Sequence, residues 1–161
     1  MNSSAETRTV AEETDIESML NEDLDDIPDL PEFVTPKEGV YGVLVKEVDT
    51  TKEVGDKRCF EIKYKITELI EKGHTNTGDE CKVGDEFSQL YFMTTPKSID
   101  FNKSVLKGLL TPVQERFGTR NLSQTLESLK GCVVAVVVKH RKDQNDKEKV
   151  YVDVKQMSFM D

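Results

Sequence analysis

The seven consecutive apolar residues at 132–138, CVVAVVV, constrain the fold of this chain more than any other stretch. This run is far shorter than the roughly 20 residues that a membrane-spanning helix needs, and its valines favour a strand. A basic cluster, KHRK, follows at once, and Val150, Val152 and Val154 then alternate with polar residues. The pattern predicts a buried strand at 132–138, a basic turn, and a return strand that begins near residue 150.

Three further strands are predicted nearer the N-terminus. The stretch GVYGVLVKEVD at 39–49 is strand-like, and Gly42 in its middle favours a bulge. In RCFEIKYKITELI, at 58–70, apolar and polar residues alternate, which is typical of a half-buried strand. The segment VGDEFSQLYFMTT at 83–95 is dense in aromatic residues and predicts a third strand.

Between the two groups of strands, the apolar period changes to that of a helix. Apolar residues recur at helical spacing from Val105 to Phe117, where Pro112 should kink or split the helix and Gly118 can end it. A second helix is predicted at 121–131, with Asn121 as its N-cap and Gly131 at its end.

Three strands, a helical insert and two more strands follow the order of the OB-fold, a five-stranded, partly open Greek-key barrel. We therefore expect a mainly β chain with a five-stranded OB-type barrel, in which the helices are inserted between strands three and four. The run at 132–138 should be a barrel strand buried on both sides. In this topology the basic hairpin tip and the loop TTKEVGDKR, at 50–58, should flank the binding face.

The charge is divided unevenly along the chain. Residues 1–38 hold twelve Asp and Glu against Arg8 and Lys37, a net charge of −10. The whole chain carries −9, so the other 123 residues carry +1, the difference between the two. We expect residues 1–38 to be a disordered acidic tail and residues 39–161 to be the OB-fold domain that binds single-stranded nucleic acid. The acidic pI of the whole chain does not exclude a nucleic-acid partner, because charge acts locally.

The cellular setting is predicted from what the sequence lacks. No apolar stretch is long enough to span a bilayer, and the start lacks the pattern of a signal peptide. The three cysteines, Cys59, Cys81 and Cys132, are an odd number without C-x-x-C spacing, and we interpret them as reduced. These features indicate a cytoplasmic protein with no membrane partner.

Four stretches carry a resemblance to a known family: LPEFVTPKEGVYGV, FEIKYKI, VGDEFSQLYF and KVYVDVK. With them, residues 30–160 resemble the OB-fold single-stranded-DNA-binding proteins of bacteriophages. The resemblance implies sequence-tolerant binding of single-stranded DNA during phage DNA replication or recombination, in the host cytoplasm. Proteins of the wider class often recruit partners through an acidic C-terminal tail, whereas the acidic tail here is N-terminal. Replication or recombination proteins docking on residues 1–38, and a weak homo-oligomer, are further expected partners.

Single-strand binding requires cations along the backbone and aromatic faces on which bases stack. The candidate stacking rings are Tyr41, Tyr91, Phe92 and Tyr151, although each could instead fill the core, as we expect of Phe60, Tyr64 and Phe87. The candidate cations are Lys52, Lys57, Arg58, Lys63, Lys65, Lys139, Arg141, Lys142, Lys149 and Lys155.

Two other interpretations remain open. The first is a protein-interaction module of the same fold that acts through its acidic tail. The second, more distant, is a metal-dependent nuclease, because Glu61-Ile62-Lys63 after Asp49 or Asp56 matches a sparse E-x-K pattern. His74, Cys59 and Cys81 fit no zinc template, and no phosphate loop, nucleophile elbow or HExxH motif occurs. We therefore predict a protein that is not an enzyme and that needs no metal or cofactor.

Overall fold

The computed structural model describes residues 20–26, 33–73, 78–142, 145 and 150–160. The chain divides into two compact units, Met1–Leu30 and Pro31–Asp161. In the first unit the described residues include one short 3-10 helix, η1 (Leu24–Asp26). The expected disorder of the tail falls mostly on residues 1–19 and 27–32, which lie outside the described residues.

The second unit begins before the expected boundary at residue 39. The backbone N–H of Val34 donates to the carbonyl oxygen of Glu86 at 2.8 Å, and Phe33 forms a parallel bridge with the same residue. Pro36 forms a second parallel bridge, with Asp79. Residues 33–38 therefore belong to the folded body, although the acidic composition of the segment before them placed them with the tail.

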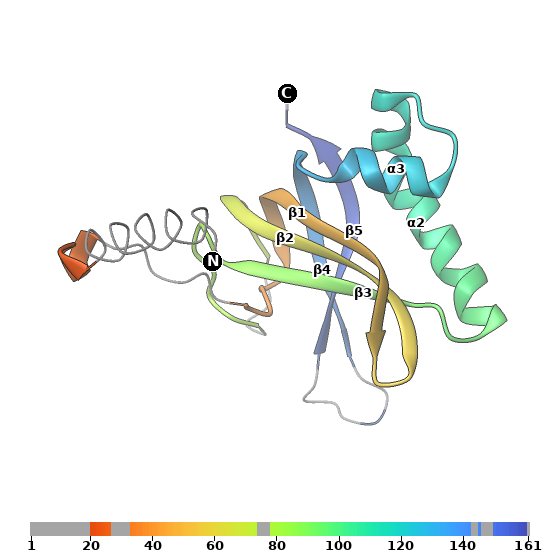
Figure 1. The fold of residues 1–161 in the computed structure, drawn as a ribbon, viewed down its shortest axis with the longest axis horizontal. Helices are drawn as coiled ribbons and strands as arrows, with labels where there is room; N and C mark the ends of the chain where they lie inside the picture. The colour runs from red at the N-terminus through yellow and green to blue at the C-terminus, as the bar shows by residue number, and fades with distance from the viewer. Residues whose placement is uncertain (1–19, 27–32, 74–77, 143–144, 146–149, 161) are drawn as a thin grey trace, which may run out of the picture. The chain divides into compact units, whose positions relative to one another are not determined.

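The body is built on one sheet of five strands in the order β3-β2-β1-β4-β5 (Figure 1). All neighbouring strands pair antiparallel. The strands are β1 (Gly39–Val54), β2 (Lys57–Lys72), β3 (Glu86–Phe92), β4 (Val133–Lys142) and β5 (Val150–Phe159). The prediction of a mainly β chain with five strands is confirmed. The sheet is open, because β3 and β5 are its two edges.

The bulge predicted at Gly42 lies on the partner strand. The register between β1 and β2 shifts between Gly42 and Val43, but the extra residue there is Thr67 of β2, and β1 pairs with β4 through the same two residues without a shift. A Cβ atom on Gly42 would lie 3.0 Å from the Cβ of Glu68 and 3.1 Å from the Sδ of Met160. Glycine therefore lets β1 approach β2 and the end of the chain closely.

Two helices connect β3 to β4: α2 (Pro96–Phe117) and α3 (Leu122–Leu129). The start of α2 near Val105 was predicted too late, because Thr95 is an N-cap that forms a capping box with Ser98. Of the kink or split predicted at Pro112, the split does not occur, since α2 is continuous through this residue. Gly118 ends α2 in the left-handed conformation, with φ 66°, as expected.

The second helix also begins as predicted. The Asn121 side chain accepts a hydrogen bond from the backbone N–H of Gln124 at 2.8 Å and thereby caps α3. Within the described part of the chain, neither helix combines the length and apolar character that crossing a bilayer requires. The three cysteines are free thiols.

The core lies where both helices cover the sheet. Leu106 and Leu110 of α2, and Leu129 of α3, join buried residues of all five strands in one apolar cluster. Strand β4 contributes Val134, Val136 and Val138 to it. The prediction that this strand is buried on both sides is wrong, because its alternate residues are half-buried or, at Val133, exposed.

Candidate nucleic-acid interface

A groove runs between the two edge strands, β3 and β5. It consists of two adjoining hollows of about 720 and 300 Å³. Both are lined by Gln89, Leu90 and Phe92 of β3 and by Arg141 of β4. The groove therefore lies between the two unpaired edges of the sheet, a gap that we call the seam. The β3 side of the groove is apolar and aromatic.

Gln89 bridges this seam with its side-chain amide. Its Oε1 accepts a hydrogen bond from the backbone N–H of Val154 at 2.7 Å, and its Nε2 donates to Oδ1 of Asp153 at 3.3 Å. Both partners lie on β5. A single side chain thus holds the two edges together at a place where no backbone ladder connects them.

Both hairpin tips contribute to the larger hollow. Val54, at the β1–β2 tip, and Asn145, between β4 and β5, line it together with Lys142 and Tyr151. The loop at 50–58 and the basic hairpin, which were expected to flank the binding face, thus both contribute residues to one hollow. They do so although β1 pairs with β4 near Gly39, at the end of β1 opposite to the Val54 tip.

Helix α2 forms the end of the smaller hollow. Asn102 donates from Nδ2 to the carbonyl oxygen of Phe92 at 2.8 Å, which fixes α2 against β3. The neighbouring Phe101 lines the hollow and is 67% exposed. Sequence reasoning missed Phe101 as a groove residue. It stands four residues before Val105 and continues the apolar pattern of the helix, which is typical of a residue that packs in the core. Leu90, Gln89 and Asn102 were missed as well, since isolated polar or aliphatic residues carry no signal for a groove.

The charges in the groove are concentrated on the last hairpin. Asp153 has a side chain only 10% exposed, and its Oδ2 lies 3.2 Å from Nε of Arg141 and 3.7 Å from Nζ of Lys155. The Arg141 guanidinium also lies over the ring of Tyr151, 4.9 Å from its centroid. The described lining of the two hollows holds three cations, Arg141, Lys142 and Lys155, against one carboxylate, Asp153. The groove is therefore net cationic on a chain that is net acidic.

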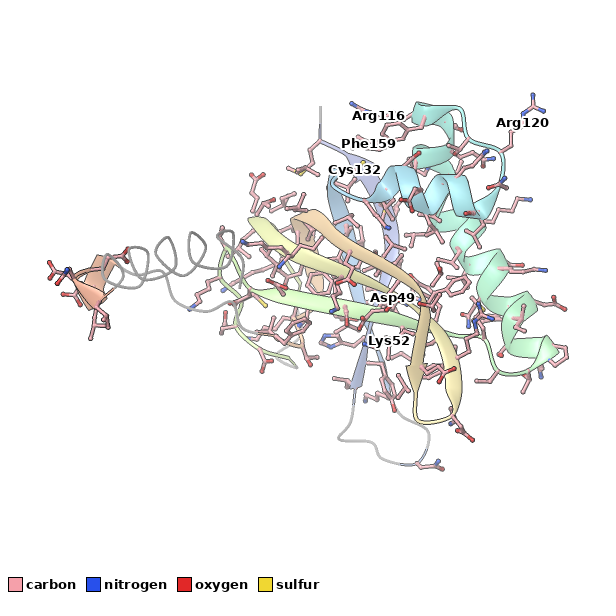
Figure 2. All side chains as sticks on the ribbon, viewed as in Figure 1. Asp49, Lys52, Arg116, Arg120, Cys132 and Phe159 are labelled. Atoms are coloured by element: carbon pink, nitrogen blue, oxygen red, sulfur yellow. The ribbon has the colours of Figure 1, made fainter. Side chains whose placement is uncertain are left out.

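The predicted cations on β1 and β2 are arranged differently. Lys52 lies 2.9 Å from Oε1 of Glu61, and Lys63 lies 3.5 Å from Glu47 and 3.8 Å from Glu61. Because it donates a hydrogen bond to Glu61, Lys52 has a raised pKa. Hydrogen bonds from Thr51 lower the pKa of the neighbouring Asp49. Figure 2 labels the side chains of Asp49 and Lys52 on this hairpin. Carboxylates therefore neutralise this patch.

The remaining predicted cations do not line the groove among the described residues. Arg58 lines a separate hollow of about 310 Å³ with residues of α3. Lys65 stands opposite Glu86 in the sheet, and Lys139 stands opposite Asp153. Lys57 is exposed at the β1–β2 tip, and Lys149 lies outside the described residues.

Burial removes Tyr41 and Tyr91 from the candidate stacking rings. Tyr91 is 2% exposed and Tyr41 is 7% exposed, and both belong to the core cluster. The Tyr41 hydroxyl donates to the carbonyl oxygen of Lys37 at 2.7 Å, and burial is the main cause that raises its pKa to about 12. Burial likewise raises the pKa of Tyr91. Tyr91 lines the smaller hollow but is buried, so Phe92 and Tyr151 are the predicted rings that are partly exposed in the groove.

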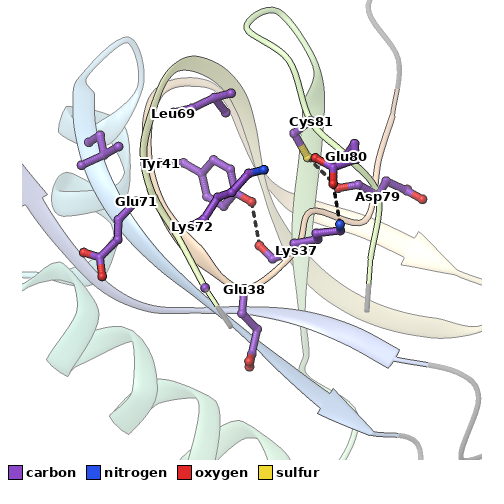
Figure 3. Close-up of a pocket in the computed structure, with 11 residues that line it drawn as sticks. Lys37, Glu38, Tyr41, Leu69, Glu71, Lys72, Asp79, Glu80 and Cys81 are labelled. Carbon is purple, nitrogen blue, oxygen red and sulfur yellow. Dashed lines mark hydrogen bonds and ion pairs between the residues drawn. The ribbon is translucent and has the colours of Figure 1, made fainter. Parts of the chain in front are cut away.

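A further cavity of about 400 Å³ lies where the start of β1 and the end of β2 meet the segment before β3 (Figure 3). Its lining holds two lysines, Lys37 and Lys72, and four acids, Glu38, Glu71, Asp79 and Glu80. Lys37 is also paired with Glu80, at 2.6 Å. This excess of carboxylates would repel a phosphate backbone, so we do not include this cavity in the interface.

The Glu61 side chain, at the centre of the nuclease pattern, is 8% exposed and has Lys52 and Lys63 as ionic partners. Over the described ranges, no three His, Cys, Asp or Glu side chains are grouped so that they could hold a metal ion. Glu61 is thus balanced by ammonium groups of its own sheet.

Among known proteins, no protein-family model matches the chain, and no curated protein matches it either. What the groove does must therefore be argued from its own geometry and charge.

Proposed function

We propose that this chain is a non-catalytic protein that binds single-stranded DNA with little sequence preference. The binding site is the groove between β3 and β5, and the body is an OB-type Greek-key barrel whose open seam is this groove. The resemblance to phage proteins supports a role in DNA replication or recombination.

The strand pairing supports the OB-type assignment. In that fold the first strand pairs with both the second and the fourth, and the helical element stands between strands three and four. Strand β1 pairs with β2 and β4, and α2 and α3 stand between β3 and β4. The Gln89 bridge provides the approach of β3 to β5 that a partly open barrel requires.

The observation that carries the functional proposal is the convergence of cations and rings in one groove. Arg141, Lys142 and Lys155 supply positive charge, and Phe92 and Tyr151 supply ring faces. Single-strand binding combines these two elements, with cations that follow the backbone and aromatic faces that hold the bases. Phosphate and stacking contacts carry little sequence information, so the binding should be sequence-tolerant.

The groove favours single strands over duplex for a steric reason. Its β3 wall includes Leu90 and Phe92, which lie in the seam and would contact exposed base faces. In a duplex the base faces are stacked on one another and are inaccessible to such side chains. A duplex could use only the phosphate contacts.

Fluorescence polarisation with labelled oligonucleotides of several lengths tests this proposal. We expect single strands to bind roughly tenfold more tightly than duplexes, or better, since stacking contributes about 1–3 kcal/mol per base. The affinity should fall steeply with salt because counterions are released. Equal affinity for duplex, or no binding at low salt, would refute the proposal. The oligonucleotide should also stay intact with magnesium; cleavage lost in Glu61→Ala would favour the nuclease interpretation.

One observation favours a protein-interaction function, although it lies on the body and not on the acidic tail through which that alternative was expected to act. Leu69 is 51% exposed and Ile70 is 44% exposed at the far end of β2, next to the acidic cavity. An exposed apolar patch that is rimmed by polar residues is one mark of a protein contact. A chain that captures a defined protein through this end, and binds no oligonucleotide, would support this second function instead.

A further inference from the structure

Four contacts form one continuous chain across the groove. The backbone N–H of Val154 donates to Oε1 of Gln89, and Nε2 of Gln89 donates to Oδ1 of Asp153. The other carboxylate oxygen of Asp153, Oδ2, accepts from Nε of Arg141. Arg141 in turn lies over the ring of Tyr151. The chain of contacts thus begins at the edge of the sheet and ends at a side chain proposed to bind DNA.

From these contacts we infer that Gln89 and Asp153 are positioning residues that hold Arg141 in the orientation needed to bind a single strand. This inference rests on the proposed function and names the device that prepares the site. Neither residue has to touch the DNA for its effect, because each would act through the Arg141 guanidinium.

The geometry explains why Arg141 needs such support. An arginine side chain has several rotatable bonds, and ordering them on binding costs conformational entropy. The Arg141 side chain is 60% exposed, so packing alone does not hold it. Its Nε is engaged by Asp153, whereas the guanidinium has two further amino groups that can donate to a phosphate. Because the ring of Tyr151 supports one face of the guanidinium, its plane is defined before the ligand arrives.

The burial of Asp153 explains why the carboxylate in turn needs Gln89. At 10% side-chain exposure, Asp153 has little water to satisfy Oδ1, and the Gln89 amide provides a donor. Gln89 is itself fixed, because its Oε1 accepts from a backbone N–H that cannot rotate away. The β5 backbone therefore fixes the position of Gln89, Gln89 fixes Asp153, and Asp153 orients the exposed Arg141 guanidinium.

A double-mutant cycle tests the inference. Single-strand affinity is measured by fluorescence polarisation for the parent chain, Gln89→Ala, Arg141→Ala and the double variant. We expect Gln89→Ala to weaken binding roughly fivefold in the parent and to have almost no further effect once Arg141 is alanine. Gln89 also lines the groove, so a direct contact with DNA is the competing explanation. It predicts the same loss in both backgrounds and would overturn the inference.

A reciprocal exchange provides a rescue experiment. Gln89→Glu alone places two carboxylates side by side and should weaken single-strand binding more than Gln89→Ala does. Adding Asp153→Asn restores the net charge and allows the same hydrogen-bond chain, because the introduced carboxylate accepts from the asparagine amide, whose oxygen accepts from Arg141. The matched control pairs Gln89→Glu with Glu127→Gln, an exposed acid on α3. Rescue by Asp153→Asn and not by the control supports the inference, and equal recovery in both overturns it.

A readout without DNA separates this inference from the proposed function. The Arg141 Nε–H is observable in ¹⁵N-edited NMR spectra, and its exchange with solvent should be slow in the parent and faster in Gln89→Ala. Thermal unfolding of each variant shows that the loss is not a loss of fold. If the parent binds no oligonucleotide, the proposed function is overturned. If the parent binds but Gln89→Ala leaves both the exchange and the affinity unchanged, the inference alone is overturned.

Discussion

The two hairpins of the sheet carry similar numbers of basic residues but present them to solvent in different ways. On β1 and β2, Lys52 and Lys63 are paired with Glu47 and Glu61, two carboxylates of the same strands. On β4 and β5, one carboxylate, Asp153, faces Arg141 and Lys155, and Lys142 lines the same groove. The first hairpin is close to neutral, and the second is a local positive surface.

This difference teaches that lysine counts do not locate a phosphate site. An ammonium group already paired with a carboxylate must exchange one anion for another, so it gains less from binding phosphate than an unbalanced cation does. Under the proposed function, local charge balance should decide which hairpin attracts a phosphate backbone. Variants of each hairpin can break or sharpen this contrast.

The largest effect is expected from removing the groove cations. The variant Arg141→Ala/Lys142→Ala/Lys155→Ala should bind single strands roughly 100-fold more weakly at low salt, about 0.9 kcal/mol for each cation. The slope of log affinity against log salt should become shallower by about 2, since each phosphate contact on a single strand contributes about 0.7. The matched control, Lys57→Ala/Lys65→Ala/Lys139→Ala, makes the same charge change outside the groove. Equal losses in the two triple variants would show that overall charge matters and not the groove.

Removing a groove ring should have the next largest effect. Phe92→Ala should weaken binding by about tenfold, towards the lower end of the range of about 1–3 kcal/mol for base stacking, with an unchanged salt dependence because no charge is removed. Tyr151→Ala should weaken binding at least as much, because it also removes the ring over which the Arg141 guanidinium lies. Phe33→Ala serves as the control, since that ring is exposed but does not line the groove. Titrations that show no loss for either groove ring would mean that bases do not stack there.

The neutralised hairpin should respond in stability and not in binding. Lys52→Met leaves the buried Glu61 carboxylate without its nearest cation, at a cost of about 1–2 kcal/mol in the free energy of unfolding. Single-strand affinity should change less than about twofold. The paired state raises the pKa of Lys52 above its ordinary 10.5, so its contribution is fully present below that pH.

Chemical denaturation across a pH series checks this prediction. The stability difference between the parent and Lys52→Met should be constant near neutral pH and should narrow as the pH rises through the raised pKa of Lys52. Lys57→Met, at an exposed position of the same hairpin, should change stability by less than about 0.5 kcal/mol. A large loss of DNA affinity in Lys52→Met would contradict the comparison.

The smallest effect is expected from the acidic N-terminal segment. Residues 1–30 hold ten Asp and Glu and one basic residue, Arg8, a net charge of −9. Replacing these acids by their amides in the full chain should tighten binding about two- to threefold at low salt, because a tethered anion competes with DNA for the groove cations. The gain should disappear at high salt. Titration of both chains at two salt concentrations decides the matter; unchanged affinity would mean that the segment does not compete.

Local patterns were sufficient to predict the elements of the sheet. Alternation of apolar residues identified the strands, and Asn121 and Gly118 marked helix ends, because each of these signals acts within a few residues. The bulge expected at Gly42 was assigned to the wrong strand, since the extra residue is on β2. The start of α2 was missed although Thr95, Pro96 and Ser98 form a recognisable capping sequence. That error came from following the apolar period alone.

The groove could be predicted only in part. The basic hairpin and Phe92 were found, because charge and aromatic content are visible in sequence. Tyr41 and Tyr91 could not be separated from Phe92 and Tyr151, since their burial depends on which face of each strand meets the helices. Gln89 carried no signal, because its partners lie 64 and 65 residues away on another edge of the sheet.

That same separation has a consequence for how the protein folds. The β1–β2 and β4–β5 hairpins form between segments that are near neighbours in the chain, whereas the Gln89 bridge joins residues 64 apart. Contacts between residues so far apart in the sequence form late, because loop-closure entropy opposes them until the rest of the chain is in place. A chain that is still folding would then have its hairpins before it has its groove. We therefore expect a partly folded molecule, which has its hairpins but not yet its groove, not to bind single-stranded DNA.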